Sequence, residues 1–287
     1  MVRKVTLLRP LKSQLKLWEK LGQVKYRHQE GLFLAEGFKV VRELLQSDWE
    51  TSAMLVVDKK AADWNDFLCS IPEGIDVYEL TETEWVKLSQ DKAPEGIMAL
   101  VAIPRSCDVA ALPALDDPGH LLLLYRINNP NNLGAVIRTA HWFGIRKILL
   151  SIGSADFTNS KVVRSAMGSL FHMAIIPDVD FAETLPEIKK RYFLVGSDDR
   201  KGVIPHACMK KAALLLGSES HGLPDNLLQM TDELWHIPGA EGADSLSLPQ
   251  AAAIMMYECA KQGTGIRGGR NGIVYSGHHD NGKKAGC

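Results

Sequence analysis

The chain has 287 residues, of which 46% are hydrophobic and 23% charged, and this composition excludes a wholly disordered protein. Its length favours two domains, and no apolar run reaches the ~18 residues that a membrane span requires. The net charge is −1 and the five cysteines are scattered without a CxxC pair, so the sequence predicts no metal site, no disulfide framework and a reducing, cytoplasmic compartment.

The charge is unevenly distributed, and the chain begins with a basic segment. Residues 1–42 carry ten lysines and arginines against three acidic residues, and residues 261–287 carry five against one. Basic ends on an acidic body favour contact with a polyanion such as nucleic acid, although a solvated basic surface is the simpler alternative. Residues 1–22 lack the apolar core and cleavage site of a signal peptide, so we expect a basic extension of the mature protein, with an organelle transit peptide as the alternative.

Residues 23–104 are predicted to form a small α/β domain. Residues 25–31 are polar and basic with one aromatic residue, and we expect them to form a loop. Helices are expected between the strands of this domain. The strands are predicted at residues 32–35, 53–57, 76–80 and 96–103.

A linker is predicted at residues 105–119, because residues 104–119 contain three prolines, two adjacent aspartates and no clear period. From residue 120 to residue 262, short apolar runs alternate with helical stretches, which indicates a parallel sheet covered on both faces. Residues 263–287 are rich in glycine, and we expect them to be disordered. Strands of the second domain are predicted at residues 121–125, 147–151, 172–176, 192–196, 213–217 and 233–237.

Three loops follow predicted strands at the edge where parallel α/β sheets bind ligands. The first, residues 128–140, is an Asn-rich turn that enters a helix whose first-turn amides suit a phosphate or carboxylate. Arg138 in that helix is a fixed, planar cation suited to phosphate. Helix capping by asparagine together with a surface arginine explains the same residues equally well.

The second and third loops contain small residues. In the second, residues 216–224, Gly217 and Gly222 let the backbone approach a ligand closely, and Glu219 could orient Arg138 or act as an acid at a helix N-terminus. The third loop, residues 237–250, has backbone groups that could hold the edge of an adenine. It leads into the clearest helix of the chain, whose apolar stripe predicts a core or a subunit interface.

These three loops, in this order and spacing, resemble the three motifs of the SpoU family of RNA ribose 2′-O-methyltransferases, which belongs to the SPOUT class. The resemblance covers roughly residues 120–261, and residues 23–104 are similar to the RNA-binding module of the family. The matching segments are Asn132-Leu-Gly134, Arg138-Thr-Ala140 and Phe143-Gly144, then Gly217-Ser-Glu219 and Gly222-Leu223, then Ile237-Pro238 and Ser245-Leu246.

The resemblance implies a parallel-sheet α/β domain with a deep trefoil knot, which is a rare exception to unknotted topology. It also implies a homodimer and a binding site for S-adenosylmethionine. Ribosomal or transfer RNA is the implied partner, with no metal and no membrane. The implied cofactor-binding residues are Leu216, Gly217, Ile237, Ser245 and Leu246, and the implied RNA-binding residues are Lys25, Arg27 and Arg164.

The resemblance implies four catalytic residues, which are Arg138, Asn132, Glu219 and Ser247. Arg138 corresponds to the catalytic arginine of the family, and it would hold the RNA phosphate and polarise the ribose hydroxyl from across the dimer. Asn132 and Glu219 would orient Arg138 and the ribose.

An NAD-dependent dehydrogenase is excluded because the first βα turn of this domain lacks a glycine fingerprint.

The third motif departs from the family pattern. Ser247 replaces the usual asparagine, Pro249 the usual second serine and Gly239 the usual methionine. Ser247 could substitute for the lost amide with a shorter reach. The alternative is an RNA-binding relative with weak or lost methyltransferase activity.

Overall fold

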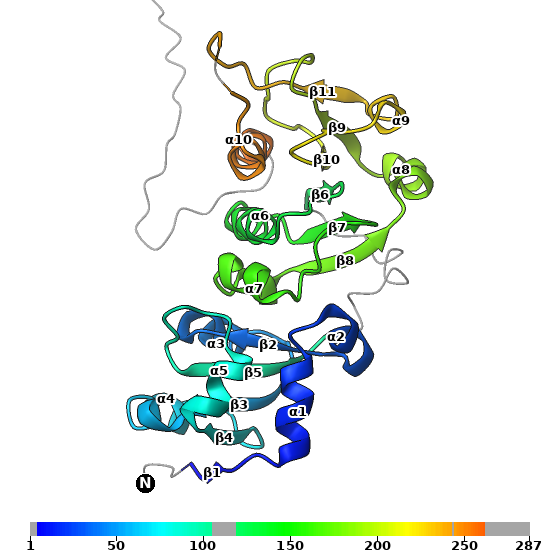
Figure 1. Ribbon diagram of the computed structural model, residues 1–287. Coiled ribbons are helices and arrows are strands. Elements are labelled where there is room, and N and C mark those ends of the chain that lie inside the picture. Colours follow the sequence, from blue (N-terminus) through cyan, green and yellow to red (C-terminus); the bar gives the residue numbers. More distant parts are fainter. Residues whose placement is uncertain (1–4, 105–118, 243, 262–287) are drawn as a thin grey trace, which may run out of the picture.

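The computed structural model describes residues 5–104, 119–242 and 244–261, which form two α/β units lying one above the other (Figure 1). The predicted linker, apart from Gly119, and the predicted disordered tail lie outside the described residues. No helix in the described ranges is long and apolar enough to cross a membrane.

The N-terminal unit contains a five-stranded mixed sheet in the order β1-β4-β3-β5-β2. Strand β3 runs parallel to β4 and antiparallel to β5, which also pairs antiparallel with β2. The elements in chain order are β1 (Leu7–Leu8), α1 (Lys12–Lys20), α2 (Val24–Glu30), β2 (Leu32–Glu36), α3 (Phe38–Leu44), β3 (Thr51–Val57), η1 (Asp58–Lys60), α4 (Asn65–Ser70), β4 (Asp76–Leu80), α5 (Glu82–Leu88) and β5 (Ile97–Ala102).

Helix α1 is part of this unit. Trp18 is buried and, with Leu21, packs on the face of the sheet that presents Leu55 and Leu100. The Trp18 ring also meets the Tyr78 ring edge-on, with 5.3 Å between centroids. The structural unit therefore begins before the boundary at residue 23 that the sequence suggested, because an amphipathic helix covers the sheet there.

Helix α2 replaces the loop that was predicted at residues 25–31, and that prediction is wrong. The segment has no apolar stripe, so periodicity gives no sign of a helix. The helix ends where Gly31 adopts a left-handed conformation (φ 64°) and donates its N–H to the carbonyl of Arg27. Its own buried residue is Arg27, so contacts with distant residues stabilise it.

The C-terminal unit contains a six-stranded sheet, all parallel, in the order β11-β9-β10-β6-β7-β8. This confirms the predicted parallel α/β domain. The elements are β6 (Leu121–Leu124), α6 (Pro130–Trp142), β7 (Lys147–Ser151), α7 (Ser160–Ala166), η4 (Ser169–His172), β8 (Ala174–Val179), α8 (Phe181–Lys189), β9 (Phe193–Ser197), β10 (Ala212–Leu216), α9 (Asp225–Leu228), β11 (Glu233–Trp235) and α10 (Leu248–Ala260). Strand β8 begins after the predicted residue 172, because the 3₁₀ turn η4 ends there.

Both faces of this sheet are buried. Leu122 and Leu124 pack with residues of α6, α7 and α10, whereas Leu121 and Leu123 pack with residues of α8 and α9. Alternate side chains of one strand thus belong to two cores, as expected for a parallel sheet between two helical layers. This arrangement brings the carboxyl ends of all six strands to one edge.

The two units share an apolar interface, in which α7 and η4 lie against β2 and α3 (Figure 1). The Trp49 and Phe171 rings meet edge-on at 5.4 Å. Beside them, His172 Nε2 lies 3.2 Å from Glu43 Oε2. Gly168 has φ 88°, and a Cβ there would lie 2.5 Å from Glu43 Cβ. The close approach of the units therefore requires glycine at this position.

Helices α6 and α7 also cross at a glycine, and Gly134→Ala is expected to destabilise the protein. A Cβ at Gly134 would clash with Ser165 Oγ and lie 2.5 Å from the carbonyl oxygen of Val162. Overpacking of this kind costs about 1–3 kcal/mol, and urea unfolding measures it. Adding Ser165→Ala removes only one of the two clashes, so partial recovery is expected. Unchanged stability of the single variant would show that the helices can separate without cost.

Candidate active site

The candidate site lies at the carboxyl ends of β6, β10 and β11. Strand β10 pairs with β6 up to Leu216 opposite Leu124, and Tyr125 N then donates to the carbonyl of Leu216 at 2.8 Å. The three loops singled out in the sequence leave these strand ends on one edge of the sheet. This edge is where ligands bind in open α/β sheets.

The first loop ends in a well-capped helix. Asn129 is the N-cap of α6, and its side-chain oxygen accepts hydrogen bonds from Asn131 N at 3.0 Å and Asn132 N at 3.5 Å. Pro130 fits the first helical position, which needs no N–H donor. Arg138 lies two turns further along the helix, where its side chain is exposed and has no hydrogen-bond or ion-pair partner among the described residues. Its guanidinium is therefore available to a ligand.

The second loop is compact, and a hydrogen bond joins it to the first. Gly222 N donates to Ser218 O at 2.8 Å, closing a tight turn. A Cβ at Gly217 would lie 2.5 Å from Gly222 O and 2.6 Å from Leu223 N, so only glycine fits this close approach. Asn132 Nδ2 donates to Glu219 Oε1, which fixes the two predicted polar residues against each other.

The third loop leaves many backbone groups without internal partners. From Ile237 to Leu246, no backbone N–H of a described residue donates to another described residue. Ser245 and Leu246 are exposed, Ile237 is half-buried, and the space around Gly239 is open. Free amides and carbonyls beside an exposed apolar side chain suit the polar edge and flat face of an adenine. The residues present therefore fit a nucleoside cofactor.

Ser247 has a structural role that sequence reasoning missed, although Ser247-x-x-Gln250 is the sequence signature of a capping box. It is the N-cap of α10, and Ser247 N donates to Gln250 Oε1 at 3.1 Å. This N–H bond is the half of a capping box in which the N3 side chain accepts from the N-cap backbone. The Ser247 hydroxyl also contacts Gln250 Oε1. Pro249 occupies the first turn of the helix, where proline is tolerated. The two substitutions in the third motif therefore keep the start of α10 intact.

The three predicted RNA-binding residues differ in their surroundings. Lys25 is exposed on α2. Arg27 is only 4% exposed, and its guanidinium pairs with Asp156 at 2.5 Å. Arg164 is half-buried and lies 3.6 Å from Asp91 of the other unit. We correct the assignment of Arg27, because a buried, paired guanidinium is not accessible to RNA in this conformation.

Sequence reasoning predicted a basic N-terminal segment and Lys25 as an RNA contact, but it did not place the lysines on one face of α1 and α2. Lys12, Lys16 and Lys20 are exposed at i, i+4 and i+8 and therefore share one side of α1. The ammonium groups of Lys20 and Lys25 lie 5.3 and 5.9 Å from the centroid of the Tyr26 ring. The helical spacing of the lysines was a signal in the sequence that could have revealed this surface.

Two family models together match most of the chain. Residues 119–257 match the SpoU rRNA methylase family, and residues 12–99 match the MRM3-like substrate-binding domain. The second match includes α1, in agreement with its packing on the sheet.

Individual relatives extend over nearly the whole chain. The 23S rRNA (guanosine(2553)-2′-O)-methyltransferase RlmP of Bacillus subtilis is 30% identical over 248 residues, 85% of this chain and 95% of that protein. The 23S rRNA (uridine(2479)-2′-O)-methyltransferase of Streptomyces viridochromogenes is 25% identical over 270 residues, 87% and 90% of the two chains. The AdoMet-bound rRNA methyltransferase of Sinorhizobium meliloti has a TM-score of 0.75 at 26% identity, and the match covers 90% of this chain and 97% of that one. The chain is thus a member of the SpoU rRNA methylase family, with a substrate-binding domain preceding its methylase domain.

Proposed function

We propose that the protein transfers a methyl group from S-adenosylmethionine to a ribose 2′-hydroxyl of ribosomal RNA. The observation that carries this proposal is the hydrogen bond between Asn132 and Glu219, which joins two family motifs beside the helix that presents Arg138. Two of the relatives named above are 23S rRNA 2′-O-methyltransferases, and the third is an rRNA methyltransferase bound to AdoMet. Free thiols at Cys69, Cys208 and Cys259 suit a reducing, cytoplasmic compartment.

The cofactor, when bound, supplies an electrophilic methyl group, and the protein must place the ribose oxygen about 3–3.5 Å from it. The Arg138 guanidinium donates hydrogen bonds to the RNA phosphate and polarises the 2′-hydroxyl, but it is a poor base because it stays protonated. Glu219 is an exposed acceptor beside Asn132 and holds the ribose by hydrogen bonds. The backbone at Leu216, Gly217 and Ile237, together with Ser245 and Leu246 of the third loop, would hold the cofactor.

We also propose that two copies pair through α6 and α10, so that Arg138 of one subunit faces the cofactor of its partner. Three large apolar side chains on these helices support this: Trp142 is 83%, Tyr257 46% and Ile254 39% exposed. Exposed aromatic and aliphatic groups on adjoining helices mark a contact surface. Within each subunit we propose that the chain around the third loop forms the trefoil knot that the family resemblance implies.

Calorimetric titration with S-adenosylmethionine, followed by transfer of a tritiated methyl group to unmodified 23S rRNA transcript, tests the main proposal. Micromolar binding, about −8 kcal/mol, and label at a single ribose are the expected results. The Ser247 hydroxyl is already bonded to Gln250, so it is not free to take the place of the asparagine that the family carries there. This favours a second candidate, an RNA-binding relative without efficient turnover. The second candidate predicts that the protein binds RNA but transfers no label to it. A protein that neither binds RNA nor labels it would contradict both candidates.

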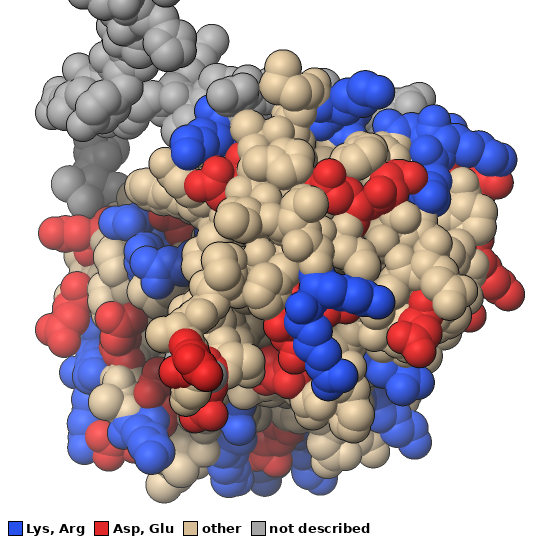
Figure 2. Space-filling view, turned by 90° about the horizontal axis from the view of Figure 1, so that it is seen from above, with Lys and Arg blue, Asp and Glu red and all other residues tan. Residues whose placement is uncertain are grey.

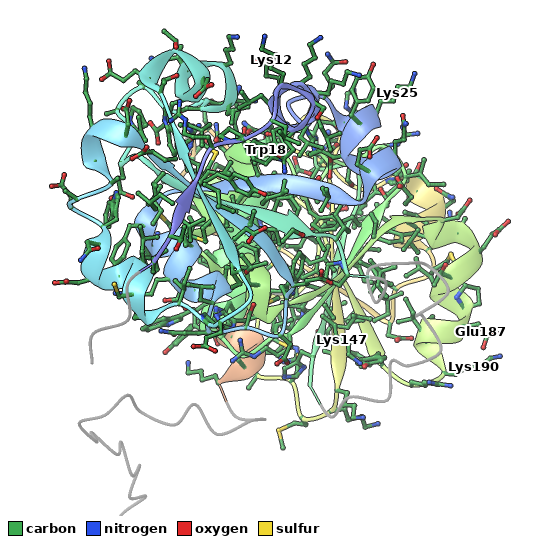
Figure 3. All side chains as sticks on the ribbon, turned by 90° about the horizontal axis from the view of Figure 1, so that it is seen from below. Lys12, Trp18, Lys25, Lys147, Glu187 and Lys190 are labelled. Carbon is green, nitrogen blue, oxygen red and sulfur yellow. The ribbon has the colours of Figure 1, made fainter. Side chains whose placement is uncertain are left out.

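The basic face of α1 and α2 is the proposed surface for the RNA backbone. Lys12 and Lys25 project outward on one side of the N-terminal unit, whereas Trp18 points into it (Figure 3). Seen from the β11 end, by contrast, basic and acidic side chains are interspersed around an uncharged middle (Figure 2). Unpaired lysines on one helical face release counterions when they meet phosphates, so affinity for RNA should depend on salt.

Replacing Lys12, Lys16 and Lys20 together by glutamine is expected to weaken RNA binding and lower the salt slope by about 2–3. Filter binding across a range of salt concentrations measures the slope. The matched control replaces Lys59, Lys189 and Lys190, which carry the same charge but pair with Glu82, Asp232 and Glu187. An unchanged slope in the first variant, or an equal fall in the control, would contradict a specific role of α1.

A further inference from the structure

Arg27 links the N-terminal unit to a loop of the methylase domain. Two of its nitrogens bond to that loop: Nε donates to Asp156 Oδ2 at 3.1 Å and to Thr158 Oγ1 at 2.9 Å, and Nη2 donates to Asp156 Oδ2 at 2.5 Å. Nη1 donates to the carbonyls of Leu21 and Gly22 at 3.0 and 3.2 Å. The side chain therefore holds the α1–α2 turn and the loop after β7 together.

The Asp156 carboxylate is built for this contact. It accepts hydrogen bonds from Thr158 N at 2.9 Å and Thr158 Oγ1 at 2.7 Å, and Thr158 is almost fully buried. Burial alone would raise the pKa of Asp156, but the Thr158 hydrogen bonds and the Arg27 charge outweigh it and lower this pKa. The carboxylate is therefore ionised at neutral pH, and the ion pair is fully formed.

The loop that carries Asp156 supports the start of α6. Ala155 N donates to Ile127 O at 2.8 Å, and Ile127 N donates to Ser154 Oγ at 3.3 Å. Next to them, Arg126 adopts a left-handed conformation (φ 52°), and its N–H donates to Ser151 Oγ at 2.8 Å. A non-glycine residue persists there only when its surroundings hold it. The residue that caps α6, Asn129, follows two positions after Ile127.

We propose that Arg27 is a positioning residue for methyl transfer, which couples the RNA-binding helix α2 to the loop that sets Asn132 and Arg138. This inference rests on the proposed function. The coupling runs from Arg27 through Asp156 to Ala155 and Ile127, and from there along the backbone into α6. Lys25 lies on the same short helix as Arg27. RNA bound at α2 is therefore held in a fixed position relative to α6, the helix that carries Arg138.

The test compares Arg27→Lys with Glu43→Gln. Lysine keeps the charge near Asp156 but loses the five-donor fork. Glu43 also bridges the two units, through His172 at 3.2 Å, but no hydrogen bond joins it to the loop after β7. Hydrogen exchange of peptides covering residues 126–134 and 152–159 is measured first, because it requires neither RNA nor cofactor.

Arg27→Lys is expected to raise exchange in both peptides roughly tenfold, and Glu43→Gln is expected to leave them unchanged. With 23S rRNA transcript, kcat is expected to fall roughly 10- to 100-fold at unchanged RNA Kd, because misplacement affects the reaction and not the binding. If Arg27→Lys fails to fold, Asp156→Asn replaces it in the test. The asparagine side chain has the same shape as aspartate but lacks its charge, and the expected effects are the same.

Two results would overturn the positioning role. One is unchanged exchange in residues 126–134. The other is weaker RNA binding at unchanged kcat, which would make Arg27 an RNA contact. If wild-type protein labels no RNA, the proposed function fails while the exchange measurement still decides whether Arg27 holds the loop.

Discussion

Arg138→Ala is expected to lower the rate of methyl transfer roughly 10²–10³-fold, the usual cost of removing one donor that stabilises a transition state. Arg138 is exposed on α6 without a partner among the described residues, so its loss leaves no buried charge and should not affect folding. Single-turnover transfer of a tritiated methyl group measures the rate, and circular dichroism with cofactor titration verifies the fold and the cofactor site.

The control for this prediction is Arg146→Ala. Arg146 is also an exposed arginine, but it precedes β7 and so lies at the amino edge of the sheet, away from the three loops. It should retain wild-type turnover. Arg138→Lys should recover only part of the rate, because an ammonium lacks the planar fork of the guanidinium. Wild-type turnover by Arg138→Ala would remove Arg138 from the mechanism.

Much of the second unit could be predicted because its elements carry local signals. The buried runs at β6, β7 and β10 have the length and apolarity of parallel strands, and the apolar stripe that begins at Leu248 marks α10. Of the asparagines at the start of α6, Asn129 caps the helix, as the sequence allowed, and Asn132 reaches Glu219. Here local propensity and the ligand-binding edge of the sheet point to the same residues.

Long-range polar contacts could not be predicted in this way. Arg27 stands in a basic stretch, where an RNA contact is the natural reading, and its partner Asp156 is 129 residues away. Only the stacking of the two units shows that the guanidinium is buried. The same contact explains why residues 24–30 form a helix although they lack an apolar stripe. Ser247 is a different case, because its capping box with Gln250 has a local signature, Ser-x-x-Gln, that sequence reasoning missed.

Gly217→Ala is expected to weaken binding of S-adenosylmethionine roughly 10- to 100-fold, since overpacking costs about 1–3 kcal/mol. The added Cβ would lie 2.5 Å from Gly222 O and 2.6 Å from Leu223 N, and both are backbone atoms that cannot rotate away. The second loop must then open and carry Glu219 away from Asn132. Calorimetry measures the loss, with Gly22→Ala in the N-terminal unit as the control, because a Cβ there would meet its nearest atoms at 3.4 and 3.7 Å, which is ordinary contact.

The same variant tests whether two subunits share a site. In a mixed dimer of Gly217→Ala and Arg138→Ala subunits, one site combines an intact cofactor loop with the intact arginine of the partner. When an equal mixture is unfolded and refolded, half of the dimers contain one subunit of each variant. One of the two sites in each mixed dimer is complete, so about a quarter of wild-type activity should return. If Arg138 acts within its own subunit, neither site of the mixed dimer is complete and no activity returns. At an S-adenosylmethionine concentration well below the Kd of Gly217→Ala, either variant alone has little activity, so the recovered fraction reports which subunit supplies the arginine.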